Sequence, residues 1–162
     1  MIVLVMGVSG SGKTTIGEAL ARELGWAYLD ADDFHPQANV DKMAAGIPLG
    51  DADRRPWLDR INEKLLEMER DERSVVVGCS ALKQAYRERL RSGLRNFRVV
   101  YLKGEFDLIR GRVTSRTHRY MPASLLQSQF DALEPPKGSI EVDVSVPVEE
   151  SVSAIRRQLL AG

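Results

Sequence analysis

The stretch MGVSGSGKTT, which begins at Met6, constrains the fold of this 162-residue chain more than any other feature. Residues 7–14 match the pattern G-x-x-x-x-G-K-[S/T] in full. An apolar run, MIVLV, precedes the motif, and a helical pattern over Lys13–Leu24 follows it. A glycine-rich loop between a strand and a helix turns its backbone N–H groups toward phosphate oxygens, and the helix N-terminus adds positive charge. The motif therefore predicts a site for a nucleoside triphosphate.

This loop supplies most of the residues that we expect to hold ATP and Mg²⁺. Lys13 is placed to reach the β- and γ-phosphates, and the Thr14 hydroxyl is placed to ligate Mg²⁺. The expected nucleotide contacts in the loop are Gly7, Val8, Ser9, Gly10, Ser11, Gly12, Lys13, Thr14 and Thr15.

Apolar runs that alternate with helical patterns predict an α/β protein. The strand-like runs lie at 1–5, 26–30, 74–79, 97–102 and 140–146. Strands separated by helices favour a parallel sheet that is covered on both faces, with ligands at the carboxyl ends of the strands. We expect one domain over 1–162. Two polar insertions, at 35–56 and 114–124, are candidate flaps over the site.

Acidic residues follow the second predicted strand. Asp30 and Asp32 are two apart, so on an extended chain their side chains point the same way. One carboxylate is expected to hold Mg²⁺ through water and the other to accept a proton from an attacking hydroxyl. We assign the metal to Asp30 and the proton to Asp32, although the residues leave this division open. Capping of a helix by Asp32 or Asp33 is the competing interpretation, and His35 is a structural histidine or a substrate contact.

Charge and composition exclude some partners. The chain has no net charge and few aromatic residues, so nucleic acid is a poor candidate. Residues 83–119 nevertheless hold eleven Lys or Arg against three acidic residues, which suits a basic wall around a polyanion. A single cysteine, Cys79, and the lack of a long apolar run predict a cytoplasmic protein without a membrane segment.

Motifs of regulatory GTPases are missing from the sequence. It has neither an N-K-x-D motif nor a D-x-x-G after the third strand. The third strand ends instead in Gly78-Cys79-Ser80-Ala81-Leu82-Lys83, where a small residue followed by Ser and Lys predicts a pocket for a polar acceptor. We therefore favour phosphoryl transfer over a switch.

Together these segments resemble the small gluconate kinase (gluconokinase) family. The matching segments are GVSGSGKTT (7–15), LDADDFHPQANVDKMAAGIPLGDADRRPWL (29–58), CSALKQAYR (79–87), YLKGEFDLIRGR (101–112) and MPASLLQSQFDALEPP (121–136). The resemblance implies ATP-dependent phosphorylation of D-gluconate at its 6-hydroxyl, a three-layer P-loop kinase fold with strand order 2-3-1-4-5, and a homodimer. It also implies a substrate-binding insertion over about 35–72 and a lid over about 112–124.

The resemblance assigns further site residues. The substrate contacts that it implies are Asp32, His35, Arg54, Ser80, Lys83, Arg87 and Gln129. Guanidinium and ammonium groups bind carboxylates well, so four cations are candidates for the carboxylate: Arg54, Arg55, Lys83 and Arg87. Arg87 lies four residues after Lys83, which predicts that one helical face carries both. By resemblance, Arg112 and Arg116 offset charge on the phosphates, and Arg112 and Pro147 lie against adenine.

The lid departs from the family pattern. Family members often have R-x-G-H-F-M, whereas residues 116–121 read RTHRYM. Arg119 stands in place of the histidine and His118 in place of the glycine, so no function is transferred to His118. A kinase for another small sugar acid or a shikimate-like substrate, and a nucleotide-binding regulator without catalysis, are the alternative functions.

Overall fold

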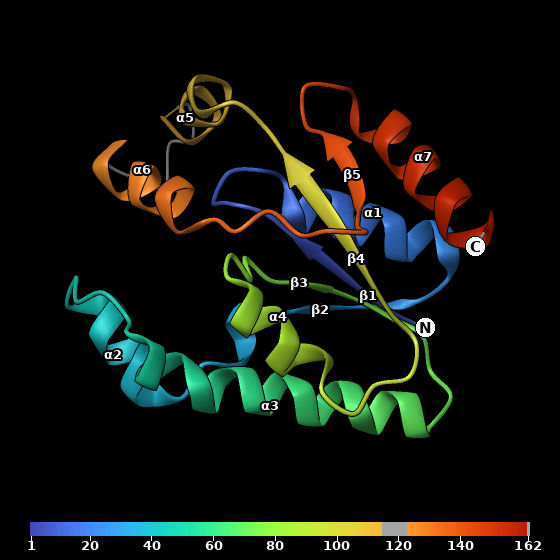
Figure 1. Ribbon diagram of the computed structural model, residues 1–162, viewed down its shortest axis with the longest axis horizontal. Coiled ribbons are helices and arrows are strands. Elements are labelled where there is room, and N and C mark those ends of the chain that lie inside the picture. Colours follow the sequence, from blue (N-terminus) through green and yellow to red (C-terminus); the bar gives the residue numbers. More distant parts are fainter. Residues whose placement is uncertain (115–122, 162) are drawn as a thin grey trace.

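A parallel five-stranded sheet in the order β2-β3-β1-β4-β5 forms the centre of the computed structural model, which describes residues 1–114 and 123–161 (Figure 1). The strands are β1 (Ile2–Met6), β2 (Ala27–Asp30), β3 (Val75–Gly78), β4 (Phe97–Lys103) and β5 (Ile140–Asp143). Parallel register pairs, such as Leu4 with Val77 and Leu4 with Val99, place the carboxyl ends of the strands at one edge of the sheet. The predicted fold class and strand order are confirmed. The fifth strand is shorter than predicted, because the chain turns after Asp143.

Helices cover both faces of the sheet. On one side lie α1 (Lys13–Leu24) and α7 (Val148–Ala161), and on the other lie α3 (Asp51–Arg70) and α4 (Gln84–Arg91) (Figure 1). A 3-10 helix, η1 (Ala31–Phe34), α2 (Gln37–Ala44), α5 (Phe106–Thr114) and α6 (Ala123–Ala132) complete the described elements. In Figure 1, α5 and α6 lie on one side of the strands' carboxyl ends and α2 lies on the other. No helix within the described ranges is long and apolar enough to cross a membrane.

Alternation along the strands separates two apolar cores. In β1, Val3 and Val5 pack with α1 and α7, whereas Ile2, Leu4 and Met6 pack with α3 and α4. Successive strand side chains point to opposite faces, so a strand that is covered on both faces must be apolar throughout. This requirement explains why β1, the strand next to the loop, reads IVLVM.

Most of α3 is anchored by one apolar stripe. Trp57, Ile61, Leu65 and Met68 are buried, as their spacing predicts. The segment 35–56, which we predicted as a flap, includes α2 and the first turn of α3. Lys42 of α2 donates to Asp53 of α3 at 2.8 Å, so the two helices are tied together.

Candidate active site

A glycine-rich loop between β1 and α1 forms one wall of the site. Gly10 and Gly12 have φ values of +82° and +97°, which residues with a side chain rarely adopt. A Cβ on Gly10 would also collide with Val113 of α5. The Lys13 ammonium donates to the carbonyls of Gly7 and Val8, both at 3.0 Å. The loop is therefore curled back onto its own lysine, as a phosphate-binding loop requires.

A cavity of 510 Å³ joins this loop to the ends of β2 and β3. Its lining comprises Ser9, Gly10, Gly12, Lys13, Thr14, Thr15, Tyr28, Asp30, Asp32, Gly78, Cys79, Ser80 and Val113. The structure thus brings the predicted loop residues together with both aspartates and with Ser80. A phosphate donor and a hydroxyl acceptor can meet in this space.

The two aspartates differ from the prediction in their backbone. Asp30 ends β2, and its carboxylate accepts the backbone N–H of Asp32 at 2.9 Å, so Asp30 caps η1. Asp32 lies within this 3-10 helix, and the expectation of an extended chain is wrong. The Asp32 side chain is 80% exposed and points into water-accessible space, whereas Asp30 is fixed by its cap. The capping role expected for Asp32 or Asp33 belongs to Asp30.

The cavity residues could bind Mg²⁺ only together with phosphate oxygens of a bound nucleotide. Within residues 1–114 and 123–161, no group of three or more His, Cys, Asp or Glu side chains forms a metal site. Thr14 and Asp30 nevertheless line the cavity with oxygen atoms, which Mg²⁺ prefers. Thr14 and Asp30 would hold the ion beside the phosphates of a bound nucleotide, where it would offset their charge.

Tyr28 is a cavity residue that sequence reasoning missed. Its ring occupies the space that a side chain at Gly17 or Gly78 would need, and its hydroxyl is hydrogen-bonded to Thr14. Burial is the main cause that raises the pKa of Tyr28 to about 12. Gly78 therefore makes room for Tyr28, and it also lines the cavity. Burial likewise raises the pKa of the Cys79 thiol to about 12, so this thiol stays protonated.

His35 is held by its neighbours rather than exposed to the cavity. Its ring stacks on Trp57 with centroids 4.3 Å apart, and its Nδ1 lies 3.2 Å from the Asn39 amide. Nε2 lies 3.8 Å from the Asp32 carboxylate. Burial, partly opposed by Asp32, lowers the pKa of His35 below its usual value. A neutral ring beside Asp32 is the arrangement that results.

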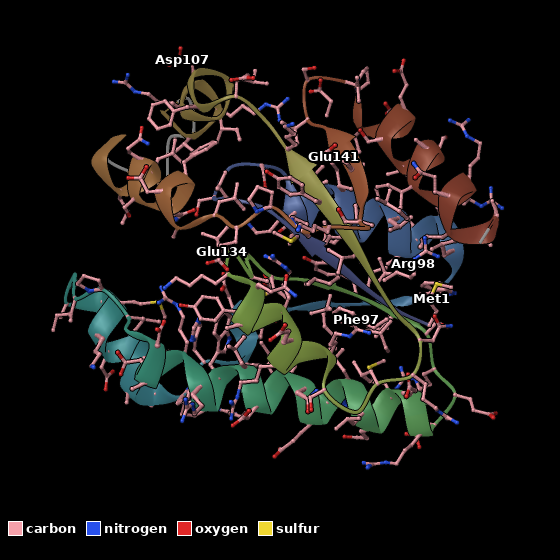
Figure 2. The ribbon with its side chains drawn as sticks, in the orientation of Figure 1. Met1, Phe97, Arg98, Asp107, Glu134 and Glu141 are labelled. Atoms are coloured by element: carbon pink, nitrogen blue, oxygen red, sulfur yellow. The ribbon has the colours of Figure 1, made fainter. Side chains whose placement is uncertain are left out.

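Arg87 does not act as predicted. It is 3% exposed, and its guanidinium donates to the carbonyls of Ala81, Leu82 and Glu134 and to the Gln84 side chain. Figure 2 shows Glu134 at the start of α4, where its carboxylate also accepts the backbone N–H of Gln84. Arg87 therefore fixes the loop after β3 from inside. Lys83, which precedes α4, points elsewhere and pairs with Asp51, so the two do not share a face.

Gln129 contacts the phosphate-binding loop. Its amide oxygen accepts the Ser9 backbone N–H at 2.8 Å, and its amide nitrogen donates to the Ser9 hydroxyl at 3.0 Å. This pair ties α6 to the loop, in place of the predicted contact with acceptor hydroxyls. Arg112 of α5 donates to the Val144 carbonyl, which brings it to the loop that contains Pro147. Arg116, His118 and Arg119 lie outside the described residues.

Arg54 and Lys83 lie beyond the cavity, at the starts of α3 and α4. Arg54 donates to the Tyr86 hydroxyl at 3.3 Å, and both cations stand over the Tyr86 ring, 5.5 and 5.7 Å from its centroid. Tyr86 was not predicted, because a tyrosine in a helical pattern carries no distinct sequence signal.

Known proteins match the chain over almost its whole length. A family model described as an AAA domain matches residues 2–136. The thermoresistant gluconokinase of Escherichia coli (strain K12) is 43% identical over 90% of this chain and 82% of its own length. The gluconokinase of Gluconobacter oxydans (strain 621H) is 41% identical over 98% of this chain and 88% of its own.

The solved structures agree with these sequence relatives. The crystal structure of a gluconokinase from Sinorhizobium meliloti 1021 superposes with a TM-score of 0.85 at 43% identity, covering 96% of this chain and 91% of that one. Identity at this level over nearly the full length, together with a shared fold, shows common family membership. The chain therefore belongs to the gluconokinase family, within the wider group that carries the AAA domain.

Proposed function

We propose that this chain is a gluconokinase, which transfers the γ-phosphoryl group of ATP to the 6-hydroxyl of D-gluconate and gives 6-phospho-D-gluconate. The observation that carries the proposal is one cavity that unites a phosphate-binding loop with an exposed carboxylate, Asp32, in a chain related to gluconokinases over almost its whole length. A hydroxyl seated between them is close to both a phosphoryl donor and a proton acceptor.

The roles within the site follow from position. The loop N–H groups and Lys13 bind the β- and γ-phosphates, and Thr14 and Asp30 hold Mg²⁺ beside them. Asp32 takes the proton as the 6-oxygen bonds to phosphorus and the bond from phosphorus to the ADP oxygen breaks. Arg112 and Arg116 offset charge on the phosphates. The acceptor carboxylate binds between Arg54 and Lys83, and the acceptor hydroxyls contact Ser80 in the cavity wall. His35 acts from behind Asp32, with Nε2 3.8 Å from that carboxylate.

An insertion over about 35–72 for the substrate and a lid over about 112–124 complete the proposed organisation. Closure of such a lid excludes water, which would otherwise take the phosphoryl group. Contact of adenine with Arg112 and Pro147 is part of the proposal, and the bond from Arg112 to Val144 supports it. A homodimer and a cytoplasmic location stay predictions.

A coupled assay tests the activity. The purified protein with ATP, Mg²⁺ and D-gluconate should yield a product that 6-phosphogluconate dehydrogenase oxidises, and chelation of Mg²⁺ should stop the reaction. No product at millimolar D-gluconate would contradict the proposal. ADP formation with another sugar acid, or with shikimate, in the same panel would favour that acceptor instead.

A further inference from the structure

Four side chains form a cluster where α3 and α4 begin, beside the proposed acceptor site. Asp51 and Arg54 come from the first turn of α3, and Lys83 and Tyr86 come from the start of α4. The Tyr86 hydroxyl donates to the Asp51 carboxylate at 2.5 Å and accepts from Arg54 at 3.3 Å. Lys83 lies 3.7 Å from the same Asp51 oxygen. The neutral Tyr86 side chain thus holds the Asp51 carboxylate near two cations, Arg54 and Lys83.

The four side chains together carry a net charge of +1. The hydrogen bond from Tyr86, and then the charge of Lys83, lower the pKa of Asp51, so its carboxylate is ionised at neutral pH. One of the two positive charges is therefore cancelled. The adjacent acid on α3, Asp53, is already paired with Lys42 at 2.8 Å and leaves this balance unchanged.

We propose that Asp51 tunes anion specificity: it reduces the Arg54–Lys83 pair to a single positive charge, which lowers the electrostatic advantage that a dianionic phosphate has over a monoanionic carboxylate at this pair. This inference rests on the proposed function, because it assumes that the acceptor carboxylate binds there. Asp51 pairs with Lys83, acts on Arg54 through its charge and lies away from the reacting atoms, so it is a specificity residue and not a catalytic one.

The physical reason is that arginine and lysine do not by themselves select carboxylate. Guanidinium and ammonium groups bind phosphate at least as readily, and a dianion gains twice the Coulomb energy of a monoanion from each cation. A fixed carboxylate between them repels the dianion twice as strongly. A kinase of this kind works among phosphate, ATP and its own phosphorylated product. A neighbouring negative charge therefore protects the acceptor site from the anions that it meets most often.

The variant Asp51→Asn separates charge from structure. The asparagine amide oxygen can still accept the Tyr86 hydroxyl, while the negative charge is lost. The probe is inorganic phosphate near pH 8, measured as an inhibitor competitive with D-gluconate at saturating ATP, so that the phosphate-binding loop is filled. We expect the inhibition constant of phosphate to fall about fivefold more than the KM for D-gluconate, which corresponds to one added unit of charge near the ligand.

The matched control is Asp59→Asn. Asp59 also lies on α3 and pairs with α4, through Arg89 at 2.6 Å, but far along the helices from the cluster. Asp59→Asn should leave the ratio of the phosphate inhibition constant to the KM for D-gluconate unchanged, and melting curves should show that both variants fold. If Asp51→Asn changes the two constants by the same factor, or changes neither, the inference is overturned. Failure of the proposed function would look different, because the unmodified protein would then not phosphorylate D-gluconate.

Discussion

At the scale of single residues, Asp32 is the group on which turnover should depend most. It lines the same cavity as the phosphate-binding loop, and its exposed carboxylate is open to an incoming hydroxyl. Asp32→Asn keeps the size of the side chain but removes its ability to accept a proton. We expect kcat to fall by about 10²- to 10⁴-fold, the usual contribution of a general base, while ATP binding measured by calorimetry stays nearly unchanged.

Asp33 offers a control for this substitution. It belongs to the same 3-10 helix, yet it is exposed and does not line the cavity. Asp33→Asn should retain kcat. Full activity in Asp32→Asn would show that the general-base assignment is wrong, and equal losses in both variants would point to damage to the helix rather than to lost chemistry.

Tyr28 and Gly78 form a pair whose sizes must match. A Cβ at Gly78 would first meet the Tyr28 hydroxyl, with the ring carbons behind it. Gly78→Ala should therefore lower the free energy of unfolding by about 1–3 kcal/mol, as overpacking does. Tyr28→Phe removes the clashing oxygen. In the Tyr28→Phe background, Gly78→Ala should lower the free energy of unfolding clearly less. Urea denaturation of the unmodified protein, the two single variants and the double variant measures the coupling. Equal costs in both backgrounds would contradict the packing argument.

At the scale of elements, Arg87 joins the loop after β3 to the segment after α6. Its buried guanidinium satisfies carbonyls of Ala81, Leu82 and Glu134. Arg87→Met keeps the apolar stem but removes the donor to these carbonyls, of which Leu82 keeps the Glu134 backbone N–H, so the free energy of unfolding should fall by about 2–4 kcal/mol. Arg89→Met, which breaks only an exposed pair, should change stability little. Unchanged stability of Arg87→Met with a raised KM for D-gluconate would instead restore the substrate-binding prediction.

Elements defined by local pattern were predictable from the sequence, whereas contacts between distant segments were not. The apolar runs and the stripe of Trp57, Ile61 and Met68 identify strands and helix faces directly. The direction of Arg87 depends on Glu134, and that of Gln129 depends on Ser9, 120 residues away. Spacing along one helix cannot reveal such partners. The same limit hid Tyr28, whose role comes from glycines on other elements, and Tyr86, whose role comes from Arg54 of α3 and from Lys83 at the start of α4.

At the scale of the whole molecule, stability should fall in two stages on acidification. Burial lowers the pKa of His35 in the folded state, so as pH falls through about 6.5 the unfolded chain takes up this proton first. Stability is therefore present above this pH and is lost below it. Hydrogen bonds from Lys42 and Arg89 lower the pKa values of Asp53 and Asp59, so their contribution is lost only as pH falls below about 4.

Urea denaturation from pH 8 to pH 3 should resolve these stages. The upper stage involves one proton, so its slope should not exceed about 1.4 kcal/mol per pH unit. His35→Gln removes the titrating group and the stacking on Trp57 together, which lowers stability at every pH but should flatten the slope between pH 7 and 5. The slope tests the burial of a neutral ring, because lost packing alone shifts the curve without changing its shape. An unchanged slope in His35→Gln would mean that His35 is protonated at no cost beside Asp32, and the neutral His35 ring described for the site would be wrong.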